Sequence, residues 1–132
     1  MGKNNNRTYC LDGIIKFKPY RFYDSVYDTC IMFYNEKGEN IVLCFDTCQN
    51  CCEDFNLRYN KKFRSKEVVS KNGIKIKCHR SNFSCEAGGK YVFFVETDEH
   101  CYNIVVSNNH NGYYGHYVGI NKNGEFIWET CI

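Results

Sequence analysis

Residues that favour helices are scarce in this sequence. Its 132 residues include one alanine and three leucines, although both types are among the best helix formers. A single proline is present, and no apolar run approaches the roughly 18 residues that a membrane-spanning helix needs. These absences argue against an all-helical fold and against a helical membrane anchor. No membrane partner is therefore expected.

Charge of one sign is also lacking, because 17 basic residues are balanced by 15 acidic ones for a formal net charge of +2. Nucleic-acid-binding proteins usually have a clearer basic excess, so this balance neither requires nor excludes such a partner. Residues 2–7 are polar, and a secretory signal is not expected there. The bias toward Asn, Lys, Tyr and Ile indicates an AT-rich genome, such as that of a virus, a phage, a protist or a clostridial host. We expect the protein in the host-cell cytoplasm or in a virion.

Aromatic residues and cysteines are abundant instead. Eleven tyrosines, ten phenylalanines and one tryptophan bring the aromatic fraction to 17%, and tyrosine and phenylalanine favour strands and large contact areas. The chain is long enough for a single domain whose core does not depend on disulfides or zinc. We expect a flexible N-terminal arm over residues 1–8 and a single β-rich domain over residues 9–132.

A hairpin is predicted in the first third of the chain. Residues 29–34 and 40–45 are β-favouring runs on either side of a polar loop that contains Gly38, and this pattern is typical of two antiparallel strands. No convincing amphipathic helix of ten or more residues follows. The best candidate is a turn or two of helix within residues 47–55.

A strictly alternating run follows in the middle of the chain. Ile74, Ile76 and Cys78 alternate with lysines, so these three side chains are expected to face the core while the lysines face water. Asn72-Gly73 immediately before the run is a tight-turn signal. We expect this turn to link the strand to residues 67–69.

The C-terminal third predicts four strands joined by turns. The expected strands are residues 91–95, 101–106, 113–120 and 125–128, and such a succession is typical of an antiparallel meander. Residues 91–95 are apolar on both faces, which favours a central strand. The fold class is therefore mainly β: a small antiparallel sheet or sandwich with a C-terminal meander and little helix.

Ten cysteines stand out, four of them bunched at Cys44, Cys48, Cys51 and Cys52. Cys48 and Cys51 form a Cys-x-x-Cys pair, whose spacing lets two thiolates bind one tetrahedral zinc ion from a turn.

Two further zinc ligands would be needed, and the sequence contains no second Cys-x-x-Cys pair. His79 and Cys85 are the best available complement. Cys78 is a weaker candidate ligand, because the alternation of its strand directs it into the core. Zinc is therefore a possible cofactor, and no other cofactor is indicated.

Two other interpretations of the cysteines stay open. Cys30, Cys44, Cys78 and Cys101 fall in apolar strand runs, where cysteine behaves as a small buried hydrophobe. Disulfides are the alternative, although the sequence gives no connectivity. A Cys–His hydrolase is disfavoured because no thiol is marked as activated, and His110 and His116 are interpreted as surface or hairpin-packing residues.

Two segments suggest binding roles. Tyr113, Tyr114 and Tyr117 are interleaved with glycines, a pattern that suits stacking on a base or ligand but also fits a bulged strand whose tyrosines pack on the sheet. Lys61, Lys62 and Arg64 belong to a basic stretch. This stretch could contact phosphates, or it could be a solvated loop or sheet edge.

The chain resembles an uncharacterised domain family of phages and bacteria. The resemblance rests on Gln49-Asn50-Cys51-Cys52-Glu53 after a β-hairpin and on Asn111-Gly112-Tyr113-Tyr114 near the C-terminal strands. It covers the chain from about residue 13 onward and implies a small β-rich domain of unknown function. The many additional cysteines and the basic connector, residues 58–66, depart from that family's pattern.

The sequence favours a non-enzymatic binding or assembly protein of a virus or mobile element. Its aromatic-rich surface would contact a protein partner or further copies of the chain, because large aromatic side chains suit interface hot spots. Zinc or disulfide cross-links would make it more rigid. The alternative is a nucleic-acid- or nucleotide-binding module that uses the basic stretch and the tyrosines.

Overall fold

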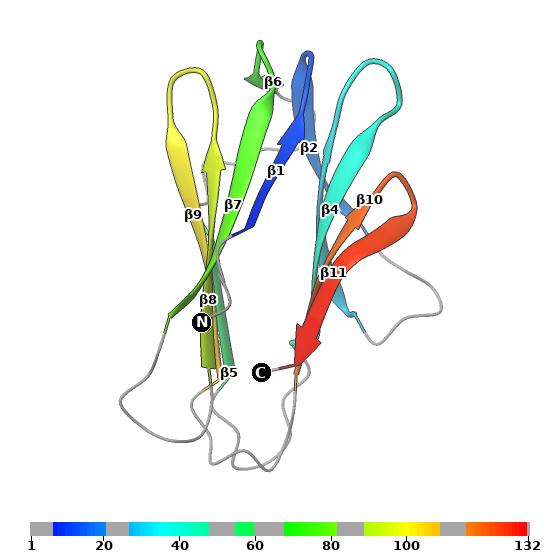
Figure 1. The fold of residues 1–132 in the computed structure, drawn as a ribbon. Helices are drawn as coiled ribbons and strands as arrows, with labels where there is room; N and C mark the ends of the chain where they lie inside the picture. Colours follow the sequence, from blue (N-terminus) through cyan, green and yellow to red (C-terminus); the bar gives the residue numbers. More distant parts are fainter. Residues whose placement is uncertain are drawn as a thin grey trace, which may run out of the picture.

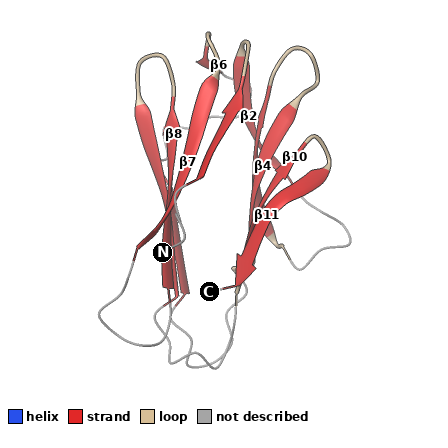
Figure 2. Cartoon of the chain, viewed as in Figure 1, coloured by secondary structure: helices blue, strands red, loops and turns tan. Residues whose placement is uncertain are grey.

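The computed structural model is a β-sandwich, in which two antiparallel sheets pack face to face (Figures 1 and 2). It describes residues 7–20, 27–47, 55–59, 68–81, 89–108 and 116–131. All regular elements within these ranges are strands, and no helix occurs among them. The predicted mainly β fold class is therefore confirmed as a sandwich. The expected turn of helix at residues 47–55 falls mostly outside the described residues.

Sheet A has five strands and sheet B has six. The order in sheet A is β1 (Arg7–Leu11), β7 (Ile74–Ser81), β8 (Gly89–Glu96), β9 (Cys101–Asn108) and β5 (Phe55–Tyr59). The order in sheet B is β11 (Glu125–Cys131), β10 (Tyr117–Lys122), β4 (Asn40–Phe45), β3 (Thr29–Tyr34), β2 (Ile15–Tyr20) and β6 (Val68–Ser70). The first strand begins at Arg7, one residue before the predicted end of the N-terminal arm.

The predicted hairpin is confirmed as β3 and β4, which pair from Thr29 opposite Phe45 to Tyr34 opposite Asn40. Its loop is held by Asn35, whose side-chain oxygen accepts the backbone N–H groups of Lys37 and Glu39 at 3.0 Å. Such side-chain capping of a turn is what asparagine provides well. Gly38 in this loop has φ of +83°, a conformation that glycine adopts without strain.

The alternation of β7 is also confirmed, since Ile74, Ile76 and Cys78 are buried. The expected link to residues 67–69 takes a different form. Strand β6 pairs with β2 in sheet B, whereas β7 pairs with β1 and β8 in sheet A. The turn at Asn72-Gly73 therefore carries the chain from one sheet to the other. Gly73 donates a 2.8 Å backbone hydrogen bond to Gly13 O at this crossing.

The C-terminal strands form two hairpins rather than one continuous meander. Strand β8 is the central strand of sheet A, as predicted, and pairs with β9. Strands β10 and β11 pair with each other in sheet B. The two hairpins lie in different sheets because of strand β4. This strand is buried along almost its whole length, and it takes β10 as its second neighbour beside β3.

The main core lies between the sheets and receives side chains from both. Phe93 on β8 and Phe45 on β4 are fully buried and meet edge to face, with ring centroids 5.7 Å apart. Trp128 on β11 approaches Phe93 to 6.3 Å between centroids. Burial of aliphatic and aromatic side chains of this size supplies most of the stabilisation of a sandwich.

Strands β1, β2 and β5 were not expected from the sequence. In β2, buried Ile15 and Phe17 alternate with exposed Lys16 and Lys18, which is the signature of a half-buried strand. Pro19 obscures this signal because proline cannot donate to a sheet ladder. A proline is tolerated at position 19 because β6 pairs only with Ile15 and Lys16. On that side of β2, Pro19 therefore lies at a sheet edge.

Asp98, in the turn between β8 and β9, stabilises residues 70–72, where the chain crosses from sheet B to sheet A. Its carboxylate accepts hydrogen bonds from the Ser70 hydroxyl and from the backbone N–H groups of Lys71 and Asn72, the latter two at 3.2 Å. The Ser70 hydrogen bond and the backbone donors hold the pKa of Asp98 below its ordinary value. This carboxylate therefore favours the folded state when it is ionised.

Replacing Asp98 by Asn is expected to destabilise the protein at neutral pH but not in acid. A pKa that is lower in the folded than in the unfolded chain gives stability above the unfolded value, and this stability is lost as the pH falls below about 4. Urea midpoints of the wild type and Asp98→Asn should differ at neutral pH and converge in acid. Glu99→Gln, at the adjacent exposed position, is the control. A difference that stays constant across this pH range would contradict the assignment.

Candidate functional site

Two of the predicted site residues, His79 and Tyr117, lie in the described part of the chain. The others lie outside it: Cys48, Cys51, Cys85, Lys61, Lys62, Arg64, Tyr113 and Tyr114. His79 on β7 contacts Phe94 edge to face at 5.5 Å between ring centroids. Among the described residues, no group of three or more Cys, His, Asp or Glu side chains is arranged to bind a metal ion. The zinc site stays a prediction.

Three of the four cysteines expected to be buried are buried, namely Cys30, Cys44 and Cys78. The prediction for Cys101 is wrong, because this residue opens β9 and is exposed. The strand pairing explains why Cys101 is exposed. Glu96 lies directly opposite on β8, and both side chains point to the outer face of sheet A.

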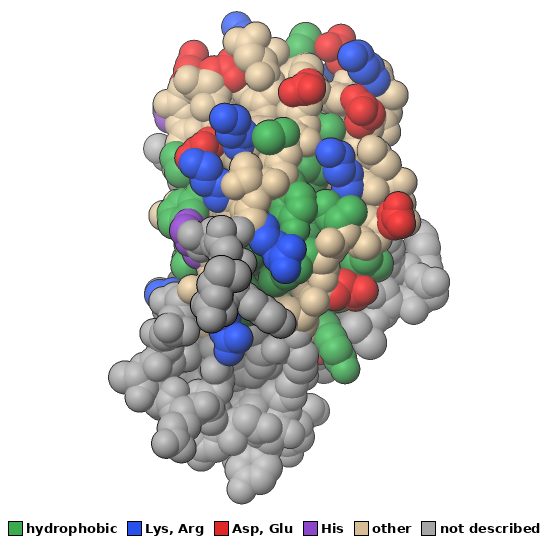
Figure 3. Space-filling model, in the orientation of Figure 1, with side chains coloured by type: hydrophobic (Ala, Val, Ile, Leu, Met, Phe, Trp, Pro, Cys, Tyr) green, Lys and Arg blue, Asp and Glu red, His purple; other side chains and the backbone are tan. Residues whose placement is uncertain are grey.

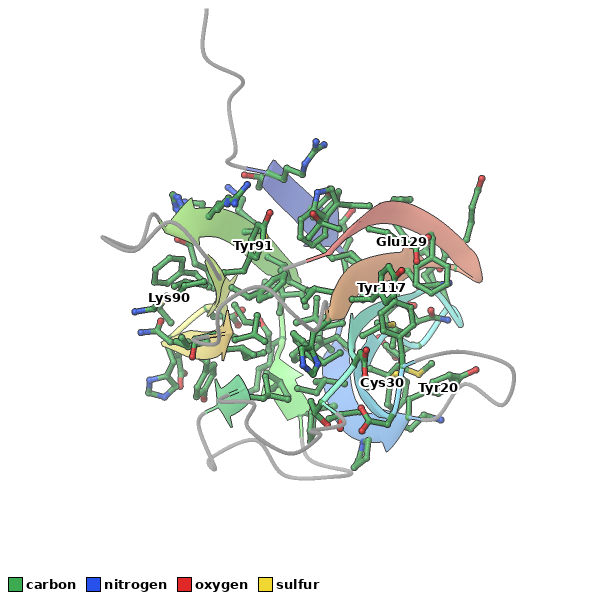
Figure 4. All side chains as sticks on the ribbon, turned by 90° about the horizontal axis from the view of Figure 1, so that it is seen from below. Tyr20, Cys30, Lys90, Tyr91, Tyr117 and Glu129 are labelled. Atoms are coloured by element: carbon green, nitrogen blue, oxygen red, sulfur yellow. The ribbon has the colours of Figure 1, made fainter. Side chains whose placement is uncertain are left out.

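The outer face of sheet B carries a row of side chains that runs across five strands. Cross-strand register places Tyr20 opposite Cys30, and Cys30 opposite Cys44. Cys44 in turn lies opposite Gly119, and Gly119 opposite Glu129. Figure 4 shows Tyr20, Cys30 and Glu129 along this sheet, with Tyr91 on the other.

Tyr27 covers the middle of this row. Its hydroxyl donates a 2.6 Å hydrogen bond to Glu129 Oε2, and its ring lies 5.5 Å from that of Phe126. Burial, followed by the hydrogen bond to Glu129, raises the pKa of Tyr27 far above its ordinary value. The phenol therefore stays protonated and acts as a hydrogen-bond donor.

Gly119 makes the position of Tyr27 possible. A Cβ atom added at Gly119 would lie 2.9 Å from the Tyr27 hydroxyl oxygen and 3.2 Å from Phe126 Cε1. Glycine within a strand commonly marks such a close approach. The absence of a side chain at Gly119 on β10 thus lets the Tyr27 hydroxyl approach sheet B closely and reach Glu129 on β11.

A second apolar cluster results on the outside of sheet B. Its buried members are Tyr27, Cys30, Met32, Val42 and Cys44. Aromatic side chains that are only partly buried surround it, and these are Tyr20, Tyr34 and Phe126. Tyr117 lies on the same face and is 47% exposed. We call Tyr20, Tyr34, Tyr117 and Phe126 the outer aromatic face.

The outer face of sheet A has a different character. Lys75 is exposed on it, and Lys77 forms a 3.0 Å ion pair with Glu96. On sheet B the exposed cation Lys18 instead lies over the Tyr34 ring, 5.2 Å from its centroid. Figure 3, which views the sandwich as in Figure 1, shows apolar side chains at the surface between separate basic and acidic ones. Among the described side chains, sheet A thus has the Phe94–His79 contact on its outer face, whereas sheet B has a larger cluster of aromatic side chains there.

While they are buried, the thiols of Cys44 and Cys78 are not nucleophiles. The hydrogen bond with Cys30, together with burial, raises the pKa of Cys44 far above its ordinary value. Burial raises the pKa of Cys78 to about 12. Both groups are therefore protonated at neutral pH, whereas nucleophilic catalysis requires the thiolate.

His116 also has a structural role. The surface interpretation of His116 is wrong, because this residue is buried, whereas a packing role is consistent with its position. Its Nδ1 lies 2.8 Å from the backbone oxygen of Asp46 and 3.9 Å from the Asp46 carboxylate. These contacts tie the start of β10 to the end of β4.

A surface hollow of about 430 Å³ lies at the crossing between the sheets. Asp12, Lys75 and Asp98 contribute charges of both signs to its lining. Asp98 already accepts hydrogen bonds from the turn that precedes β7. The Asp98 carboxylate in this hollow is thus engaged in holding the fold together, and the outer aromatic face is the stronger candidate for function.

Tyr27, Gly119 and Glu129 were missed by sequence reasoning. Gly119 did give a signal, because it is an isolated glycine in the apolar strand run that follows Tyr117, and such a glycine suggests a close approach of another group. Neither Tyr27 nor Glu129 belongs to a motif. Their contact joins residues 102 positions apart and depends on the strand order of sheet B.

None of the protein-family models, curated proteins or solved structures compared with this chain matches it. The resemblance to an uncharacterised phage and bacterial family therefore stays a prediction. Within the described residues, no helix has the length and apolarity needed to cross a bilayer.

Proposed function

We propose that this chain is a non-enzymatic assembly protein that binds a second copy of itself through the outer aromatic face. The observation that carries this proposal is a second apolar cluster outside sheet B, surrounded by partly exposed aromatic side chains. Tyrosine and phenylalanine are enriched at protein interfaces, where they supply large contact areas at low entropic cost. An origin in a virus or mobile element is part of the same proposal.

The charges around this face suit self-association. Lys16 and Lys18 lie on β2 toward one margin of sheet B, and Glu129 lies on β11 at the other. A two-fold axis parallel to the strands would bring β2 of one copy over β11 of the other, so that opposite charges meet. The small net charge of +2 adds little repulsion between copies.

Sedimentation equilibrium of the wild type tests this proposal directly. The wild type should show a concentration-dependent monomer–dimer equilibrium, and Tyr34→Ala should weaken it by about tenfold or more, as expected for an interface hot spot. Phe94→Ala, on the outer face of sheet A, is the matched control and should leave the equilibrium unchanged. A wild type that stays monomeric throughout, or equal effects of both variants, would refute self-association through this face.

A nucleotide- or nucleic-acid-binding module is the second candidate. It is favoured by the exposure of Tyr117 at the start of β10, directly after the segment that contains Tyr113 and Tyr114. In this role the tyrosines would stack on bases. Lys61, Lys62 and Arg64 would contact phosphates.

The two candidates differ in their response to salt. Binding to single-stranded DNA should weaken steeply with increasing salt, whereas apolar self-association should change little. Zinc bound by Cys48, Cys51, His79 and Cys85 would make either module more rigid. A native mass that exceeds the denatured mass by one zinc ion would support this addition.

A further inference from the structure

We propose that Cys30 and Cys44 are a redox modification site, at which a reversible disulfide forms across β3 and β4 in an oxidising environment. The two cysteines face one another directly in the cross-strand register. Both are buried beneath Tyr27 in the cluster outside sheet B. This inference is independent of self-association.

The hydrogen-bond pattern of the hairpin gives the pair suitable geometry. Asn35 N donates to Glu39 O at 3.0 Å, so these two residues form the hydrogen-bonded pair nearest the loop. Hydrogen-bonded and non-hydrogen-bonded pairs alternate along an antiparallel ladder. Cys30 and Cys44 lie five positions further along each strand, and they are therefore a non-hydrogen-bonded pair.

Side chains approach most closely at such positions. Opposed Cα atoms in a non-hydrogen-bonded pair are about 4.5 Å apart, within the range of about 4.4–6.8 Å found for disulfides. Both side chains point to the outer face of sheet B and belong to the same buried cluster. A disulfide can thus form without shifting either strand by a register position.

Formation of this disulfide requires an oxidant, and the burial of both thiols limits its rate. A small-molecule disulfide such as oxidised glutathione is the oxidant. When the cover over the pair opens, Cys30 or Cys44 loses its thiol proton to solvent, and the thiolate attacks the oxidant, which releases one glutathione thiol and leaves a mixed disulfide. The second cysteine then attacks this mixed disulfide, so that the protein disulfide forms and a second glutathione thiol leaves. Two thiol protons and two electrons pass to the oxidant. Because both thiols are buried beneath Tyr27, the first attack should be slow and should require transient opening of this cover.

Peptide mapping after incubation of the folded protein with oxidised glutathione tests the proposal. The triple variant Cys48→Ser, Cys51→Ser, Cys52→Ser leaves Cys44 as the only thiol in the tryptic peptide of residues 38–58. Cys30 is the only thiol in the peptide of residues 22–37. We expect these two peptides to become linked, and the link to disappear after reduction with dithiothreitol.

The oxidised protein should also have a higher urea midpoint than the reduced one, and this shift should be absent when Cys30→Ala is added. If the triple variant does not fold, chymotrypsin cleavage of the wild type after Leu43 and Phe45 separates Cys44 from the later cysteines. The proposal is overturned if Cys30 and Cys44 stay alkylatable, or pair with other cysteines, while the remaining thiols become oxidised.

Discussion

Phe93→Ala should cost about 3–5 kcal/mol of folding free energy, as is usual when a buried phenylalanine is truncated. Phe93 is fully buried on the central strand of sheet A and contacts Phe45 of sheet B. Its removal takes away contacts between the sheets and leaves a cavity that neither rigid sheet can close. Because domains of this size have about 5–15 kcal/mol of stability in total, the variant should be close to unfolding.

Urea denaturation followed by fluorescence measures this loss. The chain has one tryptophan, Trp128, whose ring lies 6.3 Å from that of Phe93 and therefore reports on the core itself. Phe94→Ala is the control, since the neighbouring side chain points to the outer face of sheet A and is partly exposed. Equal losses for the two variants would show that the faces of β8 are assigned incorrectly.

Gly73→Ala should cost about 2–4 kcal/mol, because it combines backbone strain with a steric clash. Gly73 has φ of +88°, and a Cβ atom there would lie 2.7 Å from Leu11 O. The crowding atom belongs to the backbone of β1, which is fixed by pairing with β7. The clash at Gly73 therefore cannot be relieved by rotation of a flexible side chain.

Gly38→Ala separates these two contributions. Gly38 has a similar φ of +83° but no atom within 4 Å of an added Cβ, so only the strain of about 1–2 kcal/mol applies. The excess loss in Gly73→Ala, measured by urea denaturation of both variants, reports the clash with Leu11. If Gly38→Ala were the more damaging change, the close approach at the crossing would be refuted.

The sequence was sufficient for most individual strands, although not for β1, β2 and β5, and it was not sufficient for the pairing of strands. The alternation of Ile74, Ile76 and Cys78 and the loop around Gly38 are local patterns, and both were predicted correctly. The turn at Asn72-Gly73 shows the limit. It looks the same whether the next strand pairs with the previous one or enters another sheet. The outcome depends on which strands pair with β2 and with β7, and these pairings join residues that are far apart in the sequence.

The candidate face was only partly predictable for the same reason. The binding role of Tyr117, predicted from its neighbouring glycines, stays a prediction. Burial of Cys30 and Cys44 was predicted correctly from their apolar runs. Their position in one row with Glu129 depends on β10 lying between β4 and β11. A strand order with these neighbours could not be derived from local periodicity.

The most direct test of the account is hydroxyl-radical footprinting of the wild type at low and high protein concentration. Self-association through the outer aromatic face predicts that Tyr34 and Phe126 become less oxidised as concentration rises, while Phe94 on sheet A does not change. Oxidation of Tyr34 and Phe126 that is independent of concentration, or protection centred on Phe94, would contradict the proposed assembly face.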